Sequence, residues 1–248
     1  MANPALASQL RNQGRTIQRL LDRGIRERAR SRTTVHQLRI ATRRARAALA
    51  LVDGGSKPIA IKKVRPLLRE LGNILGRIRE VDTAMNQAKA YGFSRSKLRI
   101  RREKLGRRTV RALKRARNER LADDILEIAR QVQTRPPLGL SGAVSRLQRK
   151  IIAWRGPAPR KPSELHDLRI TVKKTRYTLE VLGKKSRRLA DLQDLLGKIH
   201  DLEMLETIFS KKSSTRRDRK ALTRQTEQLI PKALDSAAKL LSGVESGR

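Results

Sequence analysis

Residues 35–52 read VHQLRIATRRARAALALV, and the pattern returns without gaps as LHDLRITVKKTRYTLEVL at residues 165–182. A second block, LRELGNILGRIREVD at residues 68–82, recurs as LADLQDLLGKIHDLE at residues 189–203. Two blocks that recur in the same order indicate an internal duplication. The sequence therefore predicts a first half over residues 1–135 and a second half over 138–248, separated by the Pro136-Pro137 turn.

Apolar residues recur every three or four positions along most of the chain, which is the signature of helices, and strand patterns are almost absent. Glycine, proline and serine clusters divide this pattern into eight expected helices. They lie near residues 4–30, 34–52, 58–91, 95–133, 138–155, 163–182, 187–210 and 215–241. Thr33 or Thr34, and Ser163, stand where N-caps are expected, and Pro66 should kink the third helix or mark a restart. We expect an all-α chain, a single domain over residues 1–248, in which two four-helix bundles are related by pseudo-two-fold symmetry.

Composition restricts the function more than it restricts the fold. The 248 residues include 60 Lys or Arg but only 23 Asp or Glu, a formal net charge of +37, which calls for anionic partners. One Trp, two Tyr and two Phe leave little surface on which bases could stack. The absence of cysteine excludes disulfides and thiolate metal sites. The longest apolar run, Ala47 to Val52, is far shorter than the roughly 20 residues that span a bilayer, and no secretory signal is apparent. We therefore expect a soluble cytoplasmic protein without a membrane partner.

The repeated helix carries its cations on one face. At about 100° per residue, one set of cations falls within about 80° of arc, with Leu38, Ala45 and Leu49 broadly opposite. This first row consists of His36, Arg39, Arg43 and Arg46, and its repeat, the second row, consists of His166, Arg169, Lys173 and Arg176. The adjoining candidates are Arg44, Lys174, Arg79, Lys198 and His200, the last of which occupies the position that corresponds to Arg79. An ordinary solvated basic face is the alternative, and the duplication of the pattern favours anion binding.

A further basic stripe follows the fourth expected helix. Its members recur at helical spacing, and residues 97–120 contain twelve cations against Glu103 and Glu119, so like-charge repulsion is poorly relieved. The stripe consists of Lys97, Arg101, Lys104, Arg108, Arg111 and Arg115. Such a helix would be stabilised by a polyanion lying along it, and a merely solubilising surface is the alternative.

The sequence offers little for catalysis or for metal binding. The histidines have mostly cationic neighbours, so we expect no metal site and no cofactor, and core histidines are the alternative to anion contacts. Glu80 with Asp82, and Asp201 with Glu203, diverge by about 200° on a helix and are poorly placed as catalytic pairs. They are better suited to pair with arginines of adjacent helices. Phosphate-binding loops and hydrolase motifs are absent from the sequence.

The two repeated blocks resemble the CHAD domain family, an all-helical family named for its histidines. Its signature H-x-L-R-[IV]-x-x-[RK]-[RK]-x-R is met from His36 to Arg46 and again from His166 to Arg176, and its second signature, L-G-x-x-R-D, resembles residues 75–80 and 196–201. The resemblance implies two four-helix bundles, a basic central cavity or groove and binding of inorganic polyphosphate. It also implies an association with polyphosphate granules, as in bacterial members of the family.

Physical chemistry agrees with that implication. Polyphosphate carries charge on every unit and no bases, and arginine forks suit phosphate oxygens. We therefore expect non-catalytic polyphosphate binding. The alternatives are a nucleic-acid-binding protein of the ribosome or nucleoid, which explains the charge equally well, and an enzyme that acts on phosphate chains.

Overall fold

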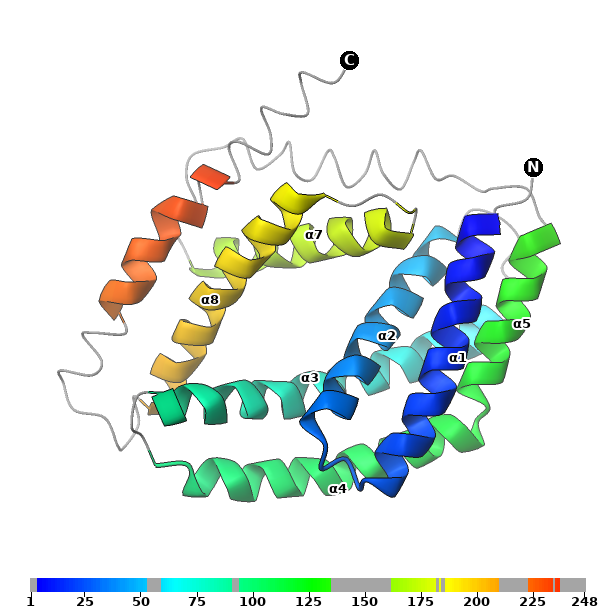
Figure 1. Ribbon diagram of the computed structural model, residues 1–248, viewed down its shortest axis with the longest axis horizontal. Helices are drawn as coiled ribbons and strands as arrows, with labels where there is room; N and C mark the ends of the chain where they lie inside the picture. Colours follow the sequence, from blue (N-terminus) through cyan, green and yellow to red (C-terminus); the bar gives the residue numbers. More distant parts are fainter. Residues whose placement is uncertain are drawn as a thin grey trace, which may run out of the picture. The chain divides into compact units, whose positions relative to one another are not determined.

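The computed structural model describes residues 4–52, 59–90, 94–134, 162–181, 183, 186–209, 223–233 and 235–236. These residues contain helices and no strands, which confirms the all-helical prediction for this part of the chain. The helices are α1 (Pro4–Arg26), α2 (Arg32–Leu51), α3 (Ile59–Ala90), α4 (Ser96–Asn118), α5 (Leu121–Thr134), α7 (Pro162–Val181) and α8 (Arg187–Phe209) (Figure 1). Residues 223–233 are also helical, whereas the helix expected at 138–155 lies outside the described residues.

The single helix expected over residues 95–133 is wrong, because the chain breaks between α4 and α5. Arg120 adopts a left-handed conformation with φ of 56°, and its N–H donates to the carbonyl of Arg117. Basic residues occupy the last turn of α4, while Asp123 and Asp124 occupy the first turn of α5. Each arrangement is favourable for the helix dipole. This reversal of charge marks a boundary that carries neither glycine nor proline.

The connection between α1 and α2 also differs from the prediction. The first helix ends at Arg26 rather than near residue 30, because Arg28 and Ala29 both have positive φ. Ser31, rather than Thr33 or Thr34, is the N-cap of α2, and its hydroxyl accepts a hydrogen bond from the Thr34 N–H. Likewise α7 begins at Pro162, so Ser163 lies within the first turn rather than before it. No restart occurs at Pro66, which lies inside the continuous helix α3.

The described helices belong to two compact units. The first unit contains α1, α2, α4, α5 and most of α3. Helix α1 packs against α2, α4 and α5, and α1 and α5 lie side by side (Figure 1). The largest fully buried side chains, among them Leu10, Ile17, Leu38, Leu75 and Leu113, come from α1 to α4. The apolar face predicted for α2 is therefore buried in the core of this unit.

The second unit contains α8, α7 except for Val181, and the described residues 223–233 and 235–236. Its core is formed by the apolar stripe of α7 against that of α8, with Ala233 joining them. The buried members are Leu165, Leu168, Val172, Leu189, Leu192, Leu196 and Ile199. Burial of Leu168 and Val172 agrees with the face that the helical spacing assigns to the core. The opposite face of α7 is left to carry its cations.

Candidate functional site

The first row lies on α2, on the side that is turned away from the buried stripe. His36 and Arg46 are exposed, and Arg39, Arg43 and the adjoining Arg44 are half-buried. Leu38, Ala41, Ala45 and Leu49 on the packed side are each at most 2% exposed. The same helix therefore anchors the row in the core and presents its cations outward.

Helix α3 brings a second set of cations to this row, and one of them was missed in the sequence. His36 lies close enough to Arg79 for their charges to interact, and Arg46 lies in the same way near Arg69. Early residues of α2 thus face late residues of α3, so the two helices run antiparallel here. Arg69 was missed although Arg69, Gly72, Gly76 and Arg79 repeat the spacing of His36, Arg39, Arg43 and Arg46. That shared spacing is the signal that could have identified Arg69.

Two glycines leave room between the arginines of α3. A Cβ atom at Gly72 would lie 3.1 Å from Arg46 Nη1, so this glycine lets the guanidinium approach the helix backbone. A Cβ atom at Gly76 would meet nothing within 4 Å. Open space therefore lies on α3 between Arg69 and Arg79, beside the first row.

Two members of this cluster, His36 and Arg46, carry lowered pKa values. Partial desolvation lowers the pKa of His36, and the charges of Arg79, Arg39 and Arg43 lower it further. Desolvation also lowers the pKa of Arg46, followed by the charges of Arg69 and Arg43. The neighbouring arginines therefore disfavour the charged forms of His36 and Arg46, and a bound anion would relieve that repulsion.

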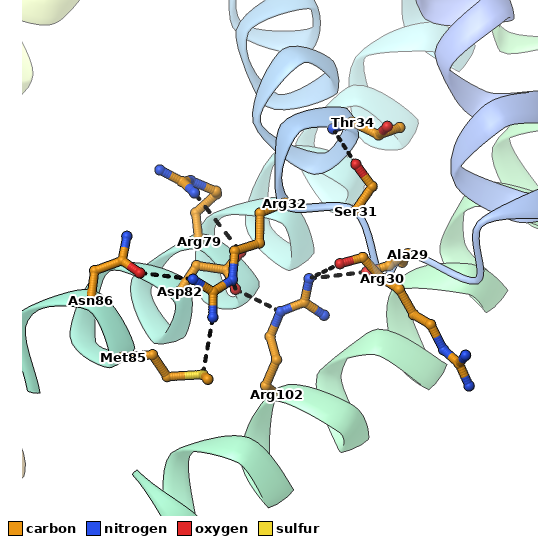
Figure 2. A network of polar contacts seen from close by, with 10 residues as sticks. All are labelled: Ala29, Arg30, Ser31, Arg32, Thr34, Arg79, Asp82, Met85, Asn86 and Arg102. Atoms are coloured by element: carbon orange, nitrogen blue, oxygen red, sulfur yellow. Dashed lines mark hydrogen bonds and ion pairs between the residues drawn. The ribbon is translucent and has the colours of Figure 1, made fainter. Parts of the chain in front are cut away.

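The buried carboxylate of Asp82 connects α3 to α2 and α4, and α2 and α3 carry the cluster. Asp82 of α3 is fully buried, and its Oδ1 atom lies 2.7 Å from Arg102 Nε of α4 and 3.4 Å from Arg32 Nε of α2 (Figure 2). Its Oδ2 atom accepts no hydrogen bond and lies 3.9 Å from Arg79 Nη1. For Asp82, this is the pairing with arginines of adjacent helices that the sequence favoured for the duplicated acids.

The same network ties down the turn between α1 and α2. Arg102 Nη2 donates to the backbone carbonyls of Ala29 at 3.0 Å and of Arg30 at 3.4 Å (Figure 2). Arg32 Nη1 donates to Asn86 Oδ1 at 2.7 Å. A chain segment with positive φ is thereby fixed directly before α2, the helix that carries the first row.

The second row has related surroundings in the second unit. His166 of α7 and His200 of α8 have ring centroids 5.8 Å apart, and His200 occupies the position that corresponds to Arg79. A Cβ atom at Gly197, which corresponds to Gly76, would again meet nothing within 4 Å. His166, Lys174 and Lys198 are exposed, whereas Arg169, Lys173, Arg176 and His200 are half-buried.

Arg176 of the second row is paired with an acid of its own helix. Arg176 Nε donates to Glu180 Oε1 at 3.0 Å, and its guanidinium carbon lies 5.5 Å from the centre of the Tyr177 ring. Part of its charge is therefore compensated within α7. Arg46, its counterpart in the first row, forms no such pair among the described residues.

The basic stripe is exposed along the whole of α4, and Leu98, Leu105 and Leu113 on its neighbouring face are buried. Its last three members, Arg108, Arg111 and Arg115, line a pocket between α3 and α4. Arg77 of α3 faces the same pocket and was missed in the sequence. The other members, Lys97, Arg101 and Lys104, lie outside this pocket.

The described residues contain neither a candidate metal centre nor a candidate membrane-spanning helix. No group of three or more histidine or acidic side chains is gathered there as a metal site would require. None of the helices searched is both long and apolar enough to traverse a bilayer.

Two solved structures share the fold of this chain. One is the crystal structure of the CHAD domain from the plant Ricinus communis, with a TM-score of 0.62 and 21% identity, covering 98% of this chain and 86% of that chain. The other is PptA from Streptomyces chartreusis, with a TM-score of 0.58 and 15% identity, covering 99% of this chain and all of that one. No curated protein matches the chain. The model of the CHAD domain matches residues 8–210, which include both rows and both repeated blocks, and the chain therefore belongs to the CHAD domain family.

Proposed function

We propose that this chain binds inorganic polyphosphate without turning it over, in contact with the first row, Arg69 and Arg79. The family is known as a polyphosphate-binding domain. The observation that carries the proposal is the convergence of like charges: His36 lies near Arg79, and Arg46 near Arg69, around open space at Gly76. Such a cluster is unfavourable when empty and becomes favourable when phosphate oxygens lie among the guanidinium groups.

The second row, with Lys198 and His200, is proposed as the equivalent site of the second half. The contact between His166 and His200, and the open space at Gly197, support this equivalence. A duplicated pair of four-helix bundles, each carrying one row, is the corresponding architecture. The affinity should then rise with polyphosphate length until the cations of the rows are engaged, since each added phosphate meets further cations and releases further counterions.

Competition at fixed ionic strength tests the choice of polyanion. Labelled long-chain polyphosphate is bound to the protein and displaced by unlabelled polyphosphate, duplex RNA or single-stranded DNA at equal phosphate concentration. We expect polyphosphate to displace the label at the lowest concentration. If a nucleic acid displaces it at an equal or lower concentration, nucleic-acid binding becomes the better assignment.

Two further measurements test whether the chain binds polyphosphate without hydrolysing it and whether it does so in cells. Incubation with polyphosphate and Mg²⁺ should release no phosphate, and release would favour an enzyme instead. A fluorescently tagged chain in bacterial cytoplasm should gather at polyphosphate granules and lose that pattern in cells that make no polyphosphate. Retention of the pattern in such cells would contradict the proposed location.

A further inference from the structure

Helix α3 has a second polar face, which is directed toward the basic stripe of α4 rather than toward the first row. A pocket of about 400 Å³ lies there, within the roughly 300–1,000 Å³ range of small-molecule sites. At about 100° per residue, its α3 residues lie roughly 140° around the helix from Arg69, Gly72 and Arg79. The lining residues are Glu70, Asn73, Ile74, Arg77, Arg108, Arg111, Ala112 and Arg115. The pocket and the first row are therefore separate places on the first unit.

The arginines of this pocket differ in how far their charge is compensated. Arg77, Arg108 and Arg111 form no ion pair with an acid within the described ranges. Arg115 is held on two sides, with Glu119 Oε1 2.7 Å from its Nε and Glu70 Oε2 3.2 Å from its Nη1. Three uncompensated guanidinium groups thus face one small volume, and a fourth is fixed at its edge.

We propose that this pocket is a second anion site, which takes a short phosphate chain, either free or as the phosphate tail of a nucleotide. Guanidinium groups from two helices can bind phosphate oxygens in pairs, and the amide of Asn73 can donate a further hydrogen bond. Ile74 and Ala112 supply an apolar wall. Three converging arginines suit several adjacent negative charges better than a single one.

Glu70 limits the length of the ligand. Its carboxylate lines the pocket and is half of the pair with Arg115, so a phosphate chain that continued past this end would meet a negative charge. A short chain that stays among Arg77, Arg108 and Arg111 avoids that repulsion. The pocket should therefore prefer short phosphate chains, whereas the first row should prefer long ones.

Arginine labelling with phenylglyoxal, measured at each residue by peptide mass spectrometry, tests the site in the full chain. Three triple Arg→Gln variants are compared with the wild type, and each removes the same charge. The pocket variant changes Arg77, Arg108 and Arg111; the row variant changes Arg39, Arg43 and Arg46; the control changes the exposed Arg15, Arg19 and Arg26 of α1. Tripolyphosphate, ATP, long-chain polyphosphate and duplex RNA are the probes.

Tripolyphosphate should slow labelling of Arg77, Arg108 and Arg111 in the wild type, the control and the row variant alike. Arg115 lines the pocket and is unchanged in every variant, so the slowing of its labelling measures the affinity of tripolyphosphate for the pocket. This affinity should fall on the order of tenfold or more in the pocket variant. ATP that protects at lower concentration than tripolyphosphate would assign the site to nucleotides, and the reverse order to free phosphate chains. Glu70→Gln should allow long-chain polyphosphate to protect the pocket as well.

Several results would overturn the site. Protection that disappears in the row variant would show that the pocket has no independent binding, and equal losses in the pocket and control variants would show bulk charge alone. Protection by duplex RNA at lower phosphate concentration than tripolyphosphate would make the pocket part of a nucleic-acid surface. If the row variant instead keeps wild-type affinity for long-chain polyphosphate while the pocket stays protected, the proposed function fails and the pocket stands.

Discussion

Replacing the buried Asp82 by asparagine should destabilise the first unit by about 2–4 kcal/mol. The carboxylate is 0% exposed and lies 2.7 Å from the guanidinium of Arg102, whose side chain is 13% exposed. Removal of one partner from a buried ion pair typically costs about 3–5 kcal/mol, because the other charge remains without compensation. Arg102 keeps its hydrogen bonds to the carbonyls of Ala29 and Arg30, and asparagine still offers an oxygen, so we expect a cost at or below the lower part of that range.

Urea denaturation followed by circular dichroism measures this cost. Asp22→Asn is the matched control, since Asp22 also pairs with an arginine of α4, namely Arg117, at 3.9 Å. The side chains of that pair are 45% and 52% exposed for Asp22 and Arg117, so its loss should cost less than about 1 kcal/mol. If Asp82→Asn costs no more than Asp22→Asn, the buried network does not hold α2, α3 and α4 together. A double-mutant cycle of Asp82→Asn with Arg102→Met then separates the pairwise energy from the burial of each group.

Packing, charge placement and protonation each give a further measurable outcome. Gly24→Ala would place a methyl group 2.8 Å from Leu113 Cδ1 and should lower the free energy of unfolding by about 1–3 kcal/mol. Gly76→Ala places its methyl group in open space and should raise the free energy of unfolding by about 0.5–1 kcal/mol. Equal urea midpoints for the two variants would contradict both expectations. The row variant should bind long-chain polyphosphate on the order of tenfold more weakly than the α1 control in equilibrium titrations, and equal losses would indicate a nonspecific polycation. Desolvation and neighbouring arginines lower the pKa of His36 in the empty protein, and a bound phosphate chain should raise it, so binding takes up protons and affinity should increase as pH falls from about 8 toward 6. His36→Gln should flatten that slope at constant ionic strength, and an unchanged slope would assign the pH dependence to other groups.

Local signals in the sequence predict most helices but not every boundary. Periodicity identifies the buried face of α2, and glycine and proline clusters identify the larger breaks. The end of α4 was missed because Arg120 occupies a left-handed position that is usually given to glycine. The change from basic residues in the last turn of α4 to Asp123 and Asp124 was the available signal. Charge order along a helix should therefore be considered together with glycine and proline when helix ends are assigned.

Part of the candidate site can be predicted from residue spacing within one helix, and the rest depends on how the helices pack together. The first row follows from the spacing of α2 alone, and Arg69 could have been found because α3 repeats that spacing. Contacts between helices are not encoded in the spacing of either one. For this reason the approach of Arg46 to Gly72, and the pocket that Arg77 shares with α4, required the structure.

With 60 cations and 23 acids, the placement of the few acids decides which basic faces remain available to an anion. Asp82 is buried inside the first unit, where it fixes Arg32 and Arg102 between helices. Glu180 compensates Arg176 in the second row, whereas Arg46 at the corresponding place of the first row has no such partner among the described residues. The two rows are thus alike in residue type and differ in the acidic neighbour of their last arginine. Counting lysines and arginines would not distinguish them, but the positions of their acidic neighbours do.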